Sequence, residues 1–298
     1  MASPLRIVIL GGGMVGQLAK FLFPDAAVLD WRARPIRKSS PFATIQLLGA
    51  MYLWEPLEGL PCTSFVVHTT VDGEEANETT VAAYKEKIGK PGDMSHWRTQ
   101  FQPTTIGWRL TGIPDSEKVQ ILYGAFVEQI DVNRREIILR SGEIFPYTIL
   151  VSTIPLPSFM SMVGMGAPSP FQHFDICIKE SPTPLDVAWA KAQDNILRIN
   201  YLSDRNVPVY RTTDWAGSRH YEWLKVHGRS REMGLPTKVI SPGKILPHPF
   251  TPKVITDLSY CGVYPFGRFG RWAPDELLHM TYKDLFTFRF DVAEGRIR

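Results

Sequence analysis

The chain has 298 residues, and its 44% of hydrophobic and 21% of charged residues provide for a folded core and argue against extensive disorder. The 33 Lys and Arg side chains exceed the 30 Asp and Glu by only three, so charge does not indicate a nucleic-acid partner, and no apolar run approaches the roughly 18 residues that span a bilayer. At about 150 residues per domain, this length predicts two domains, or one large domain with an insertion.

The cysteines and histidines do not indicate a metal site. Cys62, Cys177 and Cys261 are far apart and odd in number, which suits neither a disulfide framework nor a zinc site. The seven histidines show no paired ligand spacing. Free thiols are usual in a reducing compartment, so we expect a cytoplasmic protein.

The first thirty residues predict a strand, a glycine turn, a helix and a second strand. Residues 5–10 form an apolar, β-branched run of the kind that lies buried in a parallel sheet. A glycine-rich turn follows at 11–16, and residues 17–22 are expected to be helical. Residues 26–30 predict another buried strand, which ends in Asp30.

A strand, glycine turn and helix in this order are typical of dinucleotide-binding proteins. Gly11 permits the tight turn, Gly13 lets the backbone approach a pyrophosphate, and Gly16 allows helix and strand to pack closely. The phosphates would bind free N–H groups at the N-terminus of the helix, where Met14 and Val15 lie.

The end of the second strand bears on the identity of the dinucleotide. Asp30 stands where a ribose-binding acid is expected, about 20 residues after the first glycine. This acid would repel a 2′-phosphate, which disfavours NADP, whereas Arg32 and Arg34 could accommodate one. FAD is a third option, because its pyrophosphate could recruit one of these arginines. The segment leaves NAD, NADP and FAD open, and we assign Trp31 and Arg32 to the cofactor-binding set.

The rest of the chain predicts further strands and two helices. An apolar element over 42–54 is expected to lie over the ligand, and a helix is expected over 79–88. Residues 121–139 are typical of a β-meander with a following hairpin turn; its strands would lie near 121–123, 127–132 and 136–140. Other strands are expected at 63–67, 147–153, 174–178, 196–202, 207–212 and 260–264, and a helix opening at 274–276.

Four blocks of the sequence follow one another in the order of a known superfamily. They are residues 7–30, the strand at 127–130, the segment 147–157 and the glycine- and arginine-rich segment 267–276. In these blocks the chain resembles the FAD-binding superfamily that contains flavin monoamine oxidases, protoporphyrinogen oxidase and UDP-galactopyranose mutase. That superfamily usually has Glu where this chain has Asp30.

The resemblance implies roles for individual residues. The backbone of Val127 would hold the adenine, and Thr153 and Pro155 would lie in a turn near the cofactor. Arg268, which follows Gly267, would meet the phosphates of FAD.

The same resemblance implies that a helix N-terminus faces the N1/O2 edge of the flavin. Pro274 and Asp275 would open that helix. Negative charge develops at this edge when the flavin takes a hydride, and the N–H dipoles of the helix would stabilise it.

A fifth, weaker block at 206–212 resembles the strand that covers the flavin ring in these enzymes. Tyr210 and Arg211 are therefore candidate catalytic residues. An aromatic cage that holds an amine by cation–π attraction would add Trp272 to the catalytic set. Packing in a core or interface is the more common role of such residues. The other candidate members of this cage are Trp215, Tyr221 and Trp223.

The fold class that we expect is α/β. A Rossmann-like FAD-binding domain, built from a parallel sheet and a β-meander, would be discontinuous and comprise residues 1–55, 107–165 and 245–298. A smaller, strand-rich substrate domain would comprise residues 56–106 and 166–244.

The predicted function is an FAD-dependent oxidoreductase of the amine-oxidase type, in which a hydride passes from a carbon next to nitrogen to flavin N5. The chain is short for this superfamily, so its substrate domain would be reduced and its site open. Such a site suits a small-molecule amine or a bulky, polymer-linked one. The sequence leaves the oligomeric state open.

Three alternatives stay open. The first is a non-redox enzyme of the UDP-galactopyranose mutase type, in which Arg211 and Arg271 would grip a diphosphate. The second is a non-catalytic FAD-binding module, and the third is an NAD(P) dehydrogenase.

Overall fold

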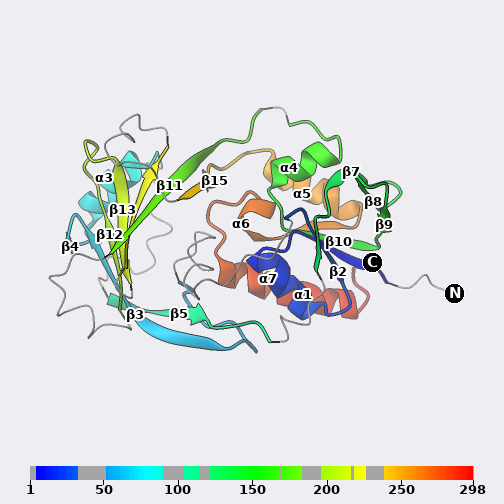
Figure 1. Ribbon diagram of the computed structural model, residues 1–298, viewed down its shortest axis with the longest axis horizontal. Coiled ribbons are helices and arrows are strands. Elements are labelled where there is room, and N and C mark those ends of the chain that lie inside the picture. Colours follow the sequence, from blue (N-terminus) through cyan, green and yellow to red (C-terminus); the bar gives the residue numbers. More distant parts are fainter. Residues whose placement is uncertain are drawn as a thin grey trace. The chain divides into compact units, whose positions relative to one another are not determined.

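A computed structural model of the chain describes residues 5–32, 52–89, 104–114, 121–167, 169–182, 196–215, 218–225 and 238–297 (Figure 1). It divides into two compact units. Unit 1 comprises Met1–Cys62, Leu110–Gln172 and Ile245–Arg298, and unit 2 comprises Thr63–Arg109 and His173–Lys244. Most of the element expected over 42–54 lies outside the described residues, as does Arg34.

Unit 1 is built on a five-stranded parallel sheet. The strand order is β16-β10-β1-β2-β6, and every neighbouring pair runs parallel. The bounds of these strands are β1 Ile7–Leu10, β2 Ala27–Asp30, β6 Ile121–Tyr123, β10 Ile149–Ser152 and β16 Val263–Pro265. The short apolar runs of β1, β2 and β10 are almost wholly buried, as strands covered by helices on both faces require.

The helices of unit 1 connect and cover this sheet. Helix α1, Met14–Leu22, forms the crossover from β1 to β2 and packs against the long C-terminal helix α7, Leu278–Ala293. The others are α4 Leu156–Met162, α5 Thr251–Tyr260 and the short α6 Gly267–Gly270. The β1–α1–β2 arrangement in a parallel sheet is compatible with a Rossmann-like FAD-binding fold.

The β-meander that we predicted is partly wrong. Strands β7, Val127–Asp131, and β8, Glu136–Leu139, do pair antiparallel, and the turn at 141–143 leads to β9, Ile144–Pro146. Strand β6, however, belongs to the parallel sheet, where Leu122 pairs with Leu29 of β2. Three apolar residues carry no local signal for the direction of pairing, so only the tertiary structure decides it.

Two expectations near the C-terminus also need correction. Tyr260 is the last residue of α5, and the strand begins only at Val263. Pro274 and Asp275 lie in a turn, and α7 begins at Leu278. Pro274 is tolerated in that turn because a proline gives up no hydrogen bond outside a regular element.

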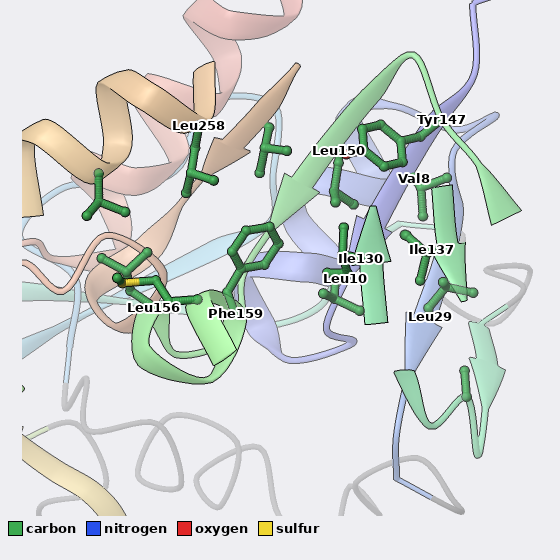
Figure 2. Close-up of a cluster of buried hydrophobic side chains, with 14 of the residues drawn as sticks. Val8, Leu10, Leu29, Ile130, Ile137, Tyr147, Leu150, Leu156, Phe159 and Leu258 are labelled. Atoms are coloured by element: carbon green, nitrogen blue, oxygen red, sulfur yellow. The ribbon is translucent and has the colours of Figure 1, made fainter. Parts of the chain in front are cut away.

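The core of unit 1 joins the sheet to the meander and to α4 and α5 (Figure 2). Phe159 of α4 is fully buried beside Leu150 of β10, while Ile137 of β8 and Val8 of β1 lie in the same cluster. Apolar side chains from segments far apart in the sequence thus hold the sheet in place.

Unit 2 contains an eight-stranded, largely antiparallel sheet. Its order is β15-β11-β14-β13-β12-β3-β4, and β5 also pairs with β3. Strand β12 runs parallel to β3, whereas the pairs β11–β14, β12–β13, β13–β14 and β3–β4 are antiparallel. Helix α3, Glu78–Lys87, begins with a capping box formed by Asn77 and Thr80. The strands are β3 Cys62–Val71, β4 Glu74–Glu75, β5 Thr104–Leu110, β11 His173–Pro182, β12 Ile196–Tyr201, β13 Val209–Trp215, β14 Ser218–Leu224 and β15 Lys238–Ile245.

In the described part of the chain, no helix is long and apolar enough to cross a membrane.

Candidate functional site

The turn between β1 and α1 requires glycine at Gly11 and Gly16 for reasons internal to the chain, and a Cβ on Gly12 would lie 2.5 Å from Oδ2 of Asp30. Gly11 has a φ of +102°, and its N–H donates to the carbonyl of Leu29 at 2.8 Å. A Cβ on Gly11 would lie 2.6 Å from Oγ1 of Thr153. A Cβ on Gly16 would lie 1.8 Å from the carbonyl oxygen of Gly11, so helix and strand can approach this closely only without a side chain there.

Gly13 is different, because no contact with the described residues requires glycine there. It is the N-cap residue of α1, its φ of −68° suits any residue, and a Cβ there would meet no atom within 4 Å. Within the described part of the chain, no side chain caps the helix. The first N–H groups of a helix have no partner within it, so the backbone at Met14 and Val15 can receive an anion.

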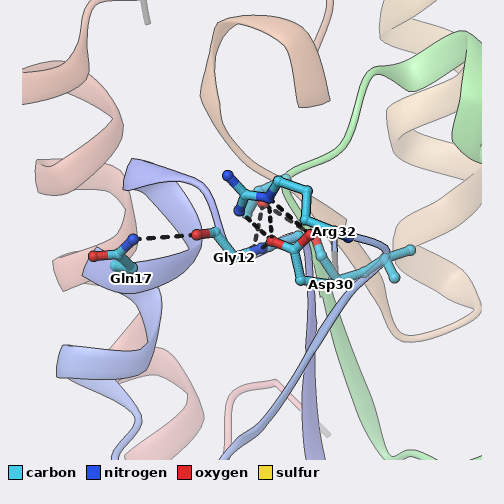
Figure 3. A network of polar contacts seen from close by, with 7 residues as sticks. Gly12, Gln17, Asp30 and Arg32 are labelled. Carbon is cyan, nitrogen blue, oxygen red and sulfur yellow. Dashed lines mark hydrogen bonds and ion pairs between the residues drawn. The ribbon is translucent and has the colours of Figure 1, made fainter. Parts of the chain in front are cut away.

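Asp30 anchors this turn at the end of β2. It is only 2% exposed, and its Oδ2 accepts a hydrogen bond from the N–H of Gly12 at 2.7 Å. Arg32 donates to the same carboxylate from its backbone N–H, at 2.9 Å, and from its guanidinium group (Figure 3). Burial opposes ionisation, but the hydrogen bonds and charge of Arg32 outweigh it, so the pKa of Asp30 is lowered.

The glycine- and arginine-rich segment near the C-terminus lies against this turn. A Cβ on Gly267, whose φ is +83°, would lie 3.0 Å from Cγ2 of Val15. A Cβ on Gly270 would lie 3.0 Å from the carbonyl oxygen of Ser152, the last residue of β10. Thr153, which follows Ser152, donates its hydroxyl to the carbonyl of Leu10 at 3.0 Å and to that of Gly11 at 3.2 Å, and so ties the end of β10 to the glycine turn. The glycine turn and the C-terminal segment, which are far apart in the sequence, therefore meet beyond the carboxyl ends of β1 and β10.

Glu276 fixes the conformation of the C-terminal segment. One of its oxygens accepts hydrogen bonds from the N–H of Gly267 at 3.1 Å and from the hydroxyl of Thr281 at 2.7 Å. Burial raises the pKa of Glu276, and the nearby charge of Arg271 opposes that rise. The sequence placed this glutamate only in the opening of an expected helix at 274–276, and its bond to a backbone N–H nine residues earlier was not predicted.

The other residues that we assigned to the cofactor lie at several places in unit 1. Pro155 is the N-cap residue of α4, and Val127 pairs with Leu139 at the start of β7. The side chain of Trp31 is 63% exposed beside the anchored Asp30.

Arg268 and Asp275 lie in the same unit. Arg268 is part of α6, with its guanidinium carbon 5.9 Å from the centre of the Phe269 ring. Asp275 precedes the N-terminus of α7 by three residues rather than opening it.

Trp272 takes a packing position. Its side chain is 3% exposed, and its Nε1 donates to the carbonyl of Leu246 at 3.0 Å. Phe171 packs edge-on against the indole, with 5.3 Å between the ring centres. These contacts commit the indole to the core of unit 1, which does not favour the catalytic role that we assigned to it.

Tyr210 and Arg211 belong to a buried ionic network in unit 2. Arg211 donates to Oε1 of Glu222 from Nε at 3.0 Å and from Nη2 at 2.6 Å, and the hydroxyl of Tyr210 donates to Oε2 at 2.8 Å. Burial and the neighbouring carboxylate of Glu222 raise the pKa of Tyr210. The ammonium group of Lys244 lies 4.2 Å from the centre of the Tyr210 ring.

The aromatic cage that we considered is not available in this form. The ring of Tyr210 already faces Lys244, and the ring of Trp215 faces Arg109 at 5.6 Å. Trp223 is fully buried. Cations of the chain itself thus occupy the ring faces that an amine substrate would need.

Among the described residues, no three His, Cys, Asp or Glu side chains gather in a way that could hold a metal ion.

The comparisons with known proteins give a likeness in fold. No protein-family model matches the sequence, and neither does any curated protein. A crystal structure of reduced UDP-galactopyranose mutase has a TM-score of 0.65 at 13% identity, over 99% of this chain and 95% of that one. The PF1083 protein from Pyrococcus furiosus has a TM-score of 0.52 at 10% identity, over 97% and 98% of the two chains. The tetrameric form of 2-methyl-3-hydroxypyridine-5-carboxylic acid oxygenase has 0.50 at 10% identity, over 99% and 84%.

These likenesses extend over nearly the whole chain. The fold is therefore shared with a UDP-galactopyranose mutase.

Proposed function

We propose that unit 1 binds FAD and that the chain is an FAD-dependent enzyme. The observation that carries this proposal is Gly13. Gly11 and Gly16 are explained by contacts within the chain, whereas Gly13 lies at an uncapped helix N-terminus with open space around it. A glycine that the fold does not need is explained by the close approach of a pyrophosphate.

The residues around this turn suit the rest of the cofactor. Thr153 and Gly267 border the turn, and Arg268 follows in α6 as a cation for the phosphates. The exposed ring of Trp31 provides an apolar face next to the turn. These residues bind and orient the cofactor, and the bound flavin supplies the capacity to accept a hydride.

We propose amine oxidation, at a carbon next to nitrogen, as the reaction class. The order of the four sequence blocks supports it. The substrate would be a small-molecule or polymer-linked amine, and the cytoplasm is the proposed location. Tyr210, which is 1% exposed, and Arg211, whose side chain is 16% exposed, would then act on the substrate site by fixing the sheet of unit 2 rather than by contacting the amine.

A mutase-type reaction is the second candidate. The fold shared with UDP-galactopyranose mutase favours it. Arg211 is held by Glu222, so a diphosphate would have to compete with that ion pair.

The cofactor is tested first. We expect the purified protein to carry a flavin absorbance band and to release FAD on denaturation. The variant Gly13→Val should fold to the secondary structure of the wild type, as circular dichroism would show, but lose most of its flavin, because the new side chain fills the space next to the helix N-terminus. The matched control is Gly166→Val, at a second glycine of unit 1 whose Cβ would meet no atom within 4 Å. A colourless wild type, or a Gly13→Val protein with full flavin content, would refute the proposed site.

The reaction class is tested on the flavin-loaded protein. Bleaching of the flavin by an amine under anaerobic conditions, with peroxide released in air, supports amine oxidation. Activity on a sugar nucleotide that requires prior reduction of the flavin supports the mutase type instead. Flavin that no substrate of either class reduces or uses would indicate a binding module.

A further inference from the structure

A cavity of about 370 Å³ lies in unit 1, between residues 55–58 and one face of helix α7. The lining side chains of α7 include His279, Tyr282, Lys283 and Phe286, whose three- and four-residue spacing places them on a single face of the helix. A volume of this size is typical of a site for a small ligand. None of these residues belongs to the set that we propose for FAD.

Contacts between residues far apart in the sequence hold the two walls of the cavity together. The hydroxyl of Tyr282 donates to the carbonyl of Glu58 at 2.7 Å, and the neighbouring Leu57 is buried. His279 is also buried, with its ring centre 5.7 Å from that of Trp54. Both walls of the cavity are therefore anchored in unit 1.

The cavity wall carries more negative than positive charge. Lys283 places its ammonium group 2.6 Å from Oε1 of Glu55, and both side chains of this pair reach solvent, so a second cation can compete for the carboxylate. The carboxylate of Glu58 pairs with no cation in the described part of the chain. Besides the imidazole of His279, two carboxylates thus face one ammonium group, and a cationic ligand would balance the second.

Aromatic side chains form an apolar stripe on the same face of α7. The ring centre of the half-buried Phe286 lies 6.3 Å from that of Tyr282, and Phe290 packs edge-on against Phe286 with 5.1 Å between the ring centres. Phe290 is exposed, so the apolar surface continues along the helix beyond the cavity. The face of an aromatic ring attracts a cation, and its area shields an apolar chain from water.

We propose that this cavity binds a primary ammonium group carried on an apolar chain. The carboxylates of Glu55 and Glu58 pair with the ammonium group, and Phe286 packs against the chain. Lys283 shows this chemistry within the protein, because it is itself an ammonium group on a four-carbon stem, held by Glu55. The ligand is a small amine or the lysine side chain of another polypeptide. Flavin is not part of this site, so the inference stands apart from the proposed function.

Hexylammonium is the probe, and hexan-1-ol and hexanoate are its neutral and anionic counterparts. Each is titrated anaerobically into the purified protein, so that amine turnover does not deplete the probe. The ring-proton NMR signals of His279 report binding in the cavity, and their loss in His279→Gln assigns them. We expect hexylammonium to shift these signals at about one tenth of the concentration of hexan-1-ol, and hexanoate to leave them unchanged.

Two variants assign the binding to the carboxylates. Lys283→Ala removes the competing ammonium group from Glu55 and should tighten hexylammonium binding about threefold. Glu58→Gln removes the other negative charge and should weaken binding about threefold. The control Lys253→Ala removes a lysine of matching exposure, 65% against 66%, which pairs with Asp257 in α5, and should leave binding unchanged.

The tripeptide acetyl-Gly-Lys-Gly-amide distinguishes the two sources of the ligand. Binding as tight as that of hexylammonium assigns the cavity to lysine side chains, and weaker binding assigns it to small amines. Equal effects of hexylammonium and hexan-1-ol, a shift caused by hexanoate, no shift at all, or a Lys283→Ala variant that binds no more tightly than the wild type would each overturn the inference. A colourless protein would refute the proposed FAD site but leave this test intact.

Discussion

The buried ion pair in unit 2 allows a sharp test of how this fold is held together. Arg211 makes two hydrogen bonds to Oε1 of Glu222, and Tyr210 makes one to Oε2. In Glu222→Gln the side chain keeps its size but loses its charge. The guanidinium of Arg211 would then stay buried without a counter-charge, and burial of a cation in that state is expensive.

The expected loss in the free energy of unfolding is about 3 to 5 kcal/mol, the range found when one partner of a buried pair is removed. Urea unfolding at neutral pH measures it. The eight tryptophans of the chain lie in both units, so their fluorescence follows both transitions, and Trp223, which is fully buried, contributes to that of unit 2. Because the chain has two compact units, the transition of unit 2 should shift while that of unit 1 stays in place.

A triple variant separates charge from packing. Arg211→Met with Glu222→Leu and Tyr210→Phe removes both charges and the hydroxyl that would lose its acceptor, and keeps apolar volume, so it should recover most of the stability that Glu222→Gln loses. If Glu222→Gln cost less than about 1 kcal/mol, Arg211 would have to reach water, and our description of a buried network would be wrong.

Two further predictions concern the glycine turn and a buried lysine. Gly16→Ala should lower the free energy of unfolding by about 1 to 3 kcal/mol, because the new Cβ would lie 1.8 Å from the carbonyl oxygen of Gly11; a variant as stable as the wild type in urea would show that the turn can relax. Burial lowers the pKa of Lys87 from 10.5 to about 8. Between pH 8 and 10.5 the unfolded chain therefore binds more protons than the folded chain, and the free energy of unfolding should rise with pH in this window. Lys87→Met removes this titration, and urea unfolding at both ends of that window should show a smaller rise in the variant; an equal rise would assign the pH dependence to other groups.

The sequence determined the part of the site that is contiguous along the chain. An apolar β-branched run, three spaced glycines and an acid at the end of the next strand were enough to predict β1, α1 and β2, because each depends on near neighbours. The meeting of Gly267 with Val15 was expected only through resemblance to a superfamily, since no local pattern links residues so far apart.

The tertiary structure decided how individual side chains are used. Asp30 is an acid in the expected place, yet its carboxylate accepts hydrogen bonds from the guanidinium group of Arg32, two residues later. Tyr210 and Arg211 look like site residues in sequence, but the register of β13 on β14 places Glu222 beside them and turns them into a buried network. Polar side chains satisfy each other wherever the fold brings them within hydrogen-bond distance, and the sequence does not contain those distances. Local order therefore follows from the sequence, whereas the partner of each buried polar group follows from the packing of strands and helices.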